Sequence, residues 1–229
     1  MANYVLIPGA GGSAWYWHRI VPELRGRGHD ALAVDLPAAD DQAGLAQYAA
    51  AVVDAIGSMP GPVLVAQSLG GFTAPQVCEK VGAQLLVLLN AMVPAPGESP
   101  GEWFASTAQA RAQAQAEHAA SEGRTADGEM DPAEDFFHDV PADVTAEAMA
   151  QGAPVQSQTP MADPWPLERW PDVPTRFLQG RDDRFFPLEF QRRVVTQRLG
   201  IAVDEMPGGH LVALSRPTEL ADRLESYLP

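Results

Sequence analysis

The sequence predicts an α/β fold: a doubly wound, mostly parallel sheet with an inserted helical cap. Short apolar runs alternate with helical stretches over residues 1–90, a pattern typical of parallel strands that are buried on both faces. The same alternation returns near Thr175 after a long stretch without convincing strands. The length of 229 residues suits one large domain. These observations favour a single sheet whose two halves are separated by an insertion.

The first half of the chain supplies four of the expected strands. They are Tyr4–Ile7, Ala31–Val34, Val63–Ala66 and Leu85–Leu89. Apolar residues at helical spacing predict the connecting helices. These helices run through Ile20, Val21 and Leu24, over Leu45–Ile56, and through Val77 and Val81. Glycine and proline clusters separate the segments, as expected of turns.

Residues 92–171 read differently, with Pro, Gly, Ala, Gln and Glu dominating. We expect a helix over Ser106–Ala120, a loop at Gly123–Pro132, and short helical pieces at Phe136–Phe137 and Val144–Met149. A structureless loop of this length is uncommon, so the stretch is interpreted as a helical cap. The core then comprises residues 1–91 and 172–229. Its second part holds strands Thr175–Leu178 and Ala202–Glu205 and helices Leu188–Leu199 and Pro217–Tyr227.

Composition excludes several classes of partner. Acidic residues outnumber basic ones by 30 to 15, giving a net charge of −15, so neither nucleic acid nor a membrane surface is expected as a partner. The single cysteine, Cys78, excludes an intramolecular disulfide and a cysteine-based zinc site. No apolar run reaches the roughly 18 residues of a spanning helix, and the N-terminus lacks the basic start of a signal peptide. We expect a cytoplasmic monomer or homodimer.

Ser68 is the candidate nucleophile. It lies in Ala66-Gln67-Ser68-Leu69-Gly70, between an apolar strand and a helix. This segment approximates G-x-S-x-G, in which a sharp strand-to-helix turn exposes the serine and needs small residues two positions away on either side. Ala66 is the smallest departure from that pattern. A helix cap is the alternative role for such a serine, and the preceding strand and the following glycines argue against it.

Asp183 and His210 are the candidate acid and base. Both follow predicted strands, at the edge of the sheet where open α/β folds place their sites. Asp182 competes with its neighbour for the role of the acid, and either aspartate is also a suitable turn residue. A metal site at His118 and His138 has no supporting spacing, so no metal is expected.

The first glycine-rich loop is the candidate source of one of the two donors of an oxyanion hole beside Ser68. Such a hole takes one backbone N–H from the residue after the nucleophile, here Leu69, and another from this loop, for which we choose Ala10. The phosphate-binding patterns G-x-x-x-x-G-K-[ST] and G-x-G-x-x-G are absent from the loop. No cofactor is expected.

These segments resemble the α/β-hydrolase superfamily over nearly the full length of the chain. More narrowly, they resemble the branch that contains plant methylesterases, hydroxynitrile lyases and bacterial esterases. The resemblance is carried by residues 7–17, 67–71, 180–187 and 209–217. The order Ser68, Asp183, His210 is the order of the triad in these enzymes, and the family spacing G-x-x-D-x-x-x-P selects Asp183 over Asp182. Pro8 stands where the branch usually has histidine.

The resemblance implies a carboxylesterase-like serine hydrolase acting on a small-molecule ester through an acyl-enzyme. Hydroxynitrile lyases of the branch use a threonine in the first loop and a lysine directly after the histidine, where this chain has Gly9 and Leu211. A thioesterase, a C–C hydrolase or another cofactor-free lyase remains an alternative use of the same triad. A weakly catalytic small-ligand-binding protein is the alternative outside enzymology.

Aromatic and apolar residues near the predicted loops suggest a pocket for a small to medium apolar group. Core packing is the alternative for any one of them. The candidate substrate-binding residues are Trp15, Trp17, Phe72, Trp103, Phe136, Phe186 and Leu211.

Overall fold

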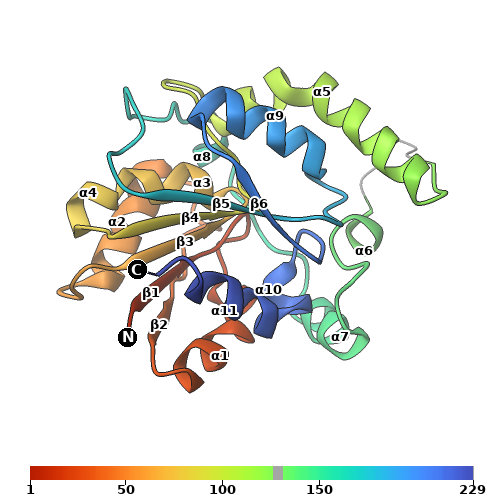
Figure 1. Ribbon diagram of the computed structural model, residues 1–229. Helices are drawn as coiled ribbons and strands as arrows, with labels where there is room; N and C mark the ends of the chain where they lie inside the picture. The colour runs from red at the N-terminus through yellow and green to blue at the C-terminus, as the bar shows by residue number, and fades with distance from the viewer. Residues whose placement is uncertain (126–130, 229) are drawn as a thin grey trace.

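Six strands form one sheet in which every neighbouring pair runs parallel, in the order β2-β1-β3-β4-β5-β6 (Figure 1). This computed structural model describes residues 1–125 and 131–228. The strands are β1 (Asn3–Ile7), β2 (Asp30–Ala33), β3 (Val63–Gln67), β4 (Leu85–Leu89), β5 (Thr175–Gly180) and β6 (Val203–Met206). The predicted α/β class is confirmed, and each predicted strand is present within two residues of its expected bounds.

Helices connect the strands and form the segment between β4 and β5. Those up to β4 are η1 (a 3-10 helix, Ala14–Trp17), α1 (Ile20–Gly26), α2 (Leu45–Ile56), α3 (Gly70–Thr73), η2 (a 3-10 helix, Ala74–Gln76) and α4 (Cys78–Val81). Those between β4 and β5 are α5 (Pro100–Ser121), α6 (Pro132–Asp135), α7 (Ala142–Ala150) and α8 (Thr159–Ala162). The last three are α9 (Leu188–Leu199), α10 (Val212–Ser215) and α11 (Pro217–Glu225).

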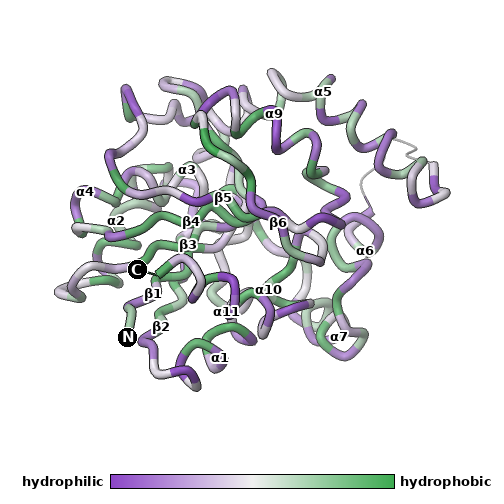
Figure 2. Tube along the Cα trace, viewed as in Figure 1, coloured by the Kyte–Doolittle hydropathy of each residue, from purple (hydrophilic) through white to green (hydrophobic). Residues whose placement is uncertain are grey.

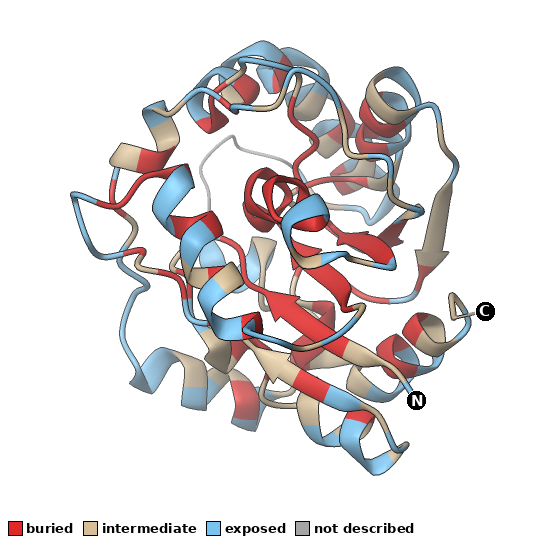
Figure 3. Ribbon diagram, turned by 90° about the vertical axis from the view of Figure 1, so that its left-hand side faces the viewer, coloured by how far each residue is buried: buried red, intermediate tan, exposed pale blue. Residues whose placement is uncertain are grey.

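Alternate residues of the central strands enter two separate cores. Val5 and Ile7 of β1 pack in a core with α2 and α9, whereas Tyr4 and Leu6 pack in a core with α1 and α11. This alternation follows from the two-residue period of a strand. Because both faces are covered, the central strands are continuously apolar and buried, as the hydropathy and burial views show (Figures 2 and 3).

The strand order reverses between β1 and β3. The chain leaves β1 toward β2 and crosses back to β3, so the loops after β1 and β3 diverge from adjacent strands. In open α/β sheets, ligands bind in the crevice at the carboxyl ends of such a pair. The first glycine-rich loop and Ser68 both lie at this point.

Two helix predictions need correction. The helix expected after Ser68 is divided into α3, η2 and α4, and Pro75, which has no N–H to donate, lies at the division. The piece expected at Phe136–Phe137 is instead a turn, because α6 ends at Asp135. Of the expected loop Gly123–Pro132, residues 126–130 lie outside the described residues. Within the described ranges, no helix has the length and apolarity to cross a membrane.

Candidate active site

Ser68 occupies a strained turn between β3 and α3. Its φ of 52° is in the left-handed region, which costs a non-glycine residue roughly 1–2 kcal/mol. Gly70 makes the turn possible, since a Cβ there would lie 2.8 Å from the Pro8 carbonyl oxygen, and one at Gly71 would lie 2.0 Å from the Met92 carbonyl oxygen. The local geometry is therefore that of a nucleophile elbow, with glycine required two and three residues after the serine.

The loop after β1 lies directly against Ser68. A Cβ on Gly9 would be 2.8 Å from the Ser68 Cβ, so the backbone approaches as closely as only glycine permits. In the described part of the chain, the N–H groups of Ala10 and Leu69 make no hydrogen bond within the protein. Two backbone donors without acceptors among the described residues are thus found in the loops that meet at Ser68.

Asp183 is fully buried and accepts hydrogen bonds on both carboxylate oxygens. Oδ1 accepts from the backbone N–H groups of Phe185 (2.9 Å) and Phe186 (2.8 Å). Oδ2 accepts from Gln179 Nε2 (3.1 Å) and lies 2.8 Å from His210 Nδ1. These neighbours fix the orientation of the carboxylate, with Oδ2 directed at the imidazole.

Asp182 has a different partner from its neighbour. Its Oδ2 accepts from the Gly208 N–H (2.8 Å), and its own N–H donates to the Gly208 carbonyl (3.0 Å). Asp182 therefore fixes the loop that carries His210, whereas Asp183 contacts the imidazole itself. The geometry agrees with the choice of Asp183 as the candidate acid.

The His210 imidazole lies among three phenylalanine rings. The ring centroids of Phe136, Phe185 and Phe186 are 5.4, 5.2 and 5.3 Å from that of His210. Gln67, the residue before Ser68, donates to the His210 carbonyl at 3.4 Å, so the two candidate groups are on adjacent loops. No hydrogen bond joins Ser68 to His210 within residues 1–125 and 131–228; such contacts often tighten only when substrate binds.

Asn90 is a residue that the sequence reasoning missed. It follows β4, has a φ of 46° and is fully buried. Its Nδ2 donates to the Gly209 and His210 carbonyls (both 3.0 Å), and its Oδ1 accepts from the Gly180 N–H (2.7 Å). Asn90 thus joins the ends of β4 and β5 to the His210 loop. A polar residue directly after the apolar run Leu85–Leu89 was the available signal.

We expect Asn90→Ala to lower the free energy of unfolding by about 2–4 kcal/mol. It leaves the Gly209 carbonyl and the Gly180 N–H without partners, and the His210 carbonyl with only the long bond from Gln67. Chemical denaturation measures this change. Asn3→Ala is the matched control, since Asn3 Nδ2 makes one exposed bond to the Pro60 carbonyl. Equal losses in the two variants would contradict the role assigned to Asn90.

The structure separates the predicted pocket residues, and only some of them lie against His210. Phe136 and Phe186 contact His210. Trp17 packs in the core under α1 and α11, while Phe72 and Trp103 pack in the opposite core. Trp15 stacks on His18, and Leu211 is partly buried beside the α1–α11 core.

Burial keeps the side chains of Cys78 and Tyr16 neutral. Burial raises the pKa of the Cys78 thiol to about 12, which keeps it protonated. Burial also raises the pKa of Tyr16, and the charges of Asp183 and Asp139 act in the same direction. Within the described ranges, no group of three or more His, Cys, Asp or Glu side chains is arranged to hold a metal ion.

Residues 4–223 match the model of the alpha/beta hydrolase family. The chain is similar to "Probable esterase PIR7A" of Oryza sativa subsp. indica, with 30% identity over 249 residues, 97% of this chain and 95% of the relative. It is also similar to "Methylesterase 8" of Arabidopsis thaliana, at 24% identity over 97% of this chain and 88% of the relative. The crystal structure of polyneuridine aldehyde esterase shares the fold, with a TM-score of 0.76, 23% identity, and coverage of 99% and 98% of the two chains.

The chain belongs to the α/β-hydrolase family. Within that family it is a carboxylesterase-like enzyme.

Proposed function

We propose that this enzyme hydrolyses carboxylic esters with Ser68 as nucleophile, His210 as general base and Asp183 as the acid that orients the base. One observation carries the proposal: the buried 2.8 Å contact between His210 Nδ1 and Asp183 Oδ2, on the loop next to the elbow of Ser68. The carboxylate holds the imidazole as the Nδ1–H tautomer, which leaves Nε2 free to accept the serine proton.

The proposed oxyanion hole consists of the Ala10 and Leu69 N–H groups. The tetrahedral intermediate carries its negative charge on the former carbonyl oxygen, where two fixed donors stabilise it. Both N–H groups lack partners among the described residues, and both lie on the loops that meet at Ser68.

The reaction then proceeds in two acyl transfers. Ser68 Oγ attacks the ester carbonyl while His210 takes its proton, and the collapse of the intermediate expels the alcohol, which receives that proton. Water, deprotonated by His210, attacks the acyl-enzyme. The bond between the acyl group and Ser68 Oγ then breaks, His210 returns the proton to Ser68 Oγ, and the acid leaves. Asp183 stabilises the imidazolium in both halves of the reaction.

The surroundings of His210 favour a small to medium apolar substrate. The phenylalanine rings at positions 136, 185 and 186 face the imidazole, and such a wall suits an alkyl or aryl group. We assign residues 92–171 as the cap over the site, because they supply Phe136 to it. The names of the relatives, esterase and methylesterase, support an ester as the substrate.

The test is hydrolysis of p-nitrophenyl acetate and p-nitrophenyl butyrate before and after treatment with a serine-reactive phosphonate. We expect turnover of both esters, its loss after treatment, and a single adduct located on Ser68 by mass spectrometry. An adduct on another residue, or turnover that survives complete labelling, would refute the proposal. Labelling of Ser68 without turnover of either ester would refute general esterase activity and favour the ligand-binding alternative.

A further inference from the structure

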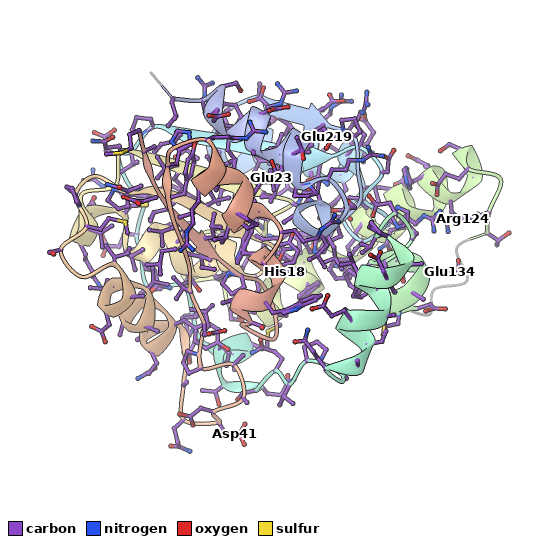
Figure 4. All side chains as sticks on the ribbon, turned by 90° about the horizontal axis from the view of Figure 1, so that it is seen from below. His18, Glu23, Asp41, Arg124, Glu134 and Glu219 are labelled. Atoms are coloured by element: carbon purple, nitrogen blue, oxygen red, sulfur yellow. The ribbon has the colours of Figure 1, made fainter. Side chains whose placement is uncertain are left out.

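The segment between β4 and β5 contacts each of the loops that carry the proposed site. In Figure 1, α5, α6 and α7 lie on the side of the sheet away from the N-terminus. The charged residues Arg124 and Glu134 of this segment lie at the edge of the molecule (Figure 4). Its inner side supplies two polar side chains, Asp139 and Gln156, to backbone N–H groups of the site.

Gln156 holds the loop after β1. Its Oε1 accepts from the Gly11 N–H at 2.9 Å, and its Nε2 donates to the Tyr48 hydroxyl and the Ser157 carbonyl, both at 3.0 Å. The Ser157 N–H in turn donates to the Ala38 carbonyl at 2.7 Å. The amide of Gln156 is therefore fixed at both ends. Its bond to the Gly11 N–H is made one residue from Ala10, whose N–H makes no hydrogen bond among the described residues.

Asp139 holds the loop of the candidate base. Its Oδ2 accepts from the Gly209 N–H at 2.8 Å, one residue before His210. The approach is close, because a Cβ on Gly209 would lie 2.8 Å from Asp139 Oδ1. The buried side chain of Val140, the next residue, packs in the α1–α11 core, so the turn that carries Asp139 is anchored to the body of the fold.

The remaining polar tethers of the His210 loop come from the sheet. At the end of β3, Gln67 donates to the His210 carbonyl, and Asn90, after β4, donates to the Gly209 and His210 carbonyls. After β5, Asp182 accepts from the Gly208 N–H. Among the described residues, Asp139 is the partner of the Gly209 N–H. The bond from Asp139 of the inserted segment therefore complements the bonds that come from the ends of the strands.

We propose that Asp139 and Gln156 are positioning residues through which the inserted segment completes the active site. Gln156 fixes the loop that presents the Ala10 N–H, and Asp139 fixes the loop that presents His210. This inference rests on the proposed esterase function. Misplacement of a catalytic group by about 1 Å can cost on the order of 10²-fold in rate, so loss of either tether should lower kcat more than it changes KM.

The test compares Asp139→Ala and Gln156→Met with two matched controls on the same segment, Asp143→Asn and Gln151→Ala, whose side chains are exposed. Rates with p-nitrophenyl butyrate are expressed per active site, counted by phosphonate titration, so that unfolded protein does not contribute. We expect kcat to fall roughly 10- to 100-fold in Asp139→Ala and Gln156→Met, with KM within about twofold. The controls should match the wild type.

Asp139→Asn provides the conservative variant, because its amide oxygen can still accept from the Gly209 N–H. We expect it to restore most of the kcat lost in Asp139→Ala. Wild-type kcat per site in both Asp139→Ala and Gln156→Met would overturn the inference while leaving the esterase function intact. Equal losses in Asp139→Asn and Asp139→Ala would also overturn the positioning role of Asp139. A wild-type protein without ester turnover would instead refute the proposed function.

Discussion

Ser68→Ala should lower ester turnover by on the order of 10⁶-fold, as is typical when the nucleophile of a triad is removed. The single cysteine cannot replace it as a nucleophile, because Cys78 is buried in α4 with its thiol pKa raised to about 12. Initial rates with p-nitrophenyl butyrate measure the loss. Turnover within tenfold of the wild type would exclude the proposed mechanism.

A second substitution separates loss of chemistry from loss of structure. Ser68→Gly removes the same hydroxyl but relieves the left-handed backbone, whose φ is 52°. The relief, roughly 1–2 kcal/mol, offsets the entropy cost of glycine, about 0.5–1 kcal/mol. We expect this variant to be inactive yet at least as stable as the wild type in thermal unfolding. A destabilised Ser68→Gly protein would show that the turn is not strained as inferred.

The sheet was predictable from the sequence because its strands are buried on both faces. Runs such as Val63–Ala66 and Leu85–Leu89 have no polar interruption, and their boundaries fall at glycine, proline or a polar residue. The helix after Ser68 was wrongly predicted to be continuous. Val77 and Val81 have helical spacing, but Pro75 interrupts the hydrogen bonding before them. Periodicity alone does not register such a break.

The residues proposed for chemistry were also accessible to sequence reasoning, because each lies in the loop or turn that follows a strand. The network that holds them was not. Asn90, Asp139 and Gln156 act through backbone groups distant in sequence, 119 residues in the case of the Asn90–Gly209 bond. Only Asn90, at the end of a strand, carried a positional signal. The role of each aromatic residue likewise depends on contacts distant in sequence. Trp17 and Phe136 were both predicted to line the pocket, yet Trp17 packs in the core and Phe136 packs against His210.

Asp183→Asn should reduce kcat by roughly 10⁴-fold while leaving the protein folded. The amide oxygen would take the place of Oδ1, which accepts from the Phe185 and Phe186 N–H groups. The NH₂ group would then face His210 Nδ1 and force it to accept a hydrogen bond. The imidazole proton would move to Nε2, which could no longer take the proton of Ser68.

The neighbouring aspartate supplies the control for this effect. In Asp182→Asn the amide oxygen can still accept from the Gly208 N–H, now bonded at 2.8 Å, and the tautomer of His210 is unaffected. We therefore expect Asp182→Asn to retain kcat within about threefold, against the roughly 10⁴-fold loss in Asp183→Asn. Because the two substitutions change the net charge identically, a general electrostatic effect would lower both rates alike. A larger loss in Asp182→Asn would reverse the assignment of the acid.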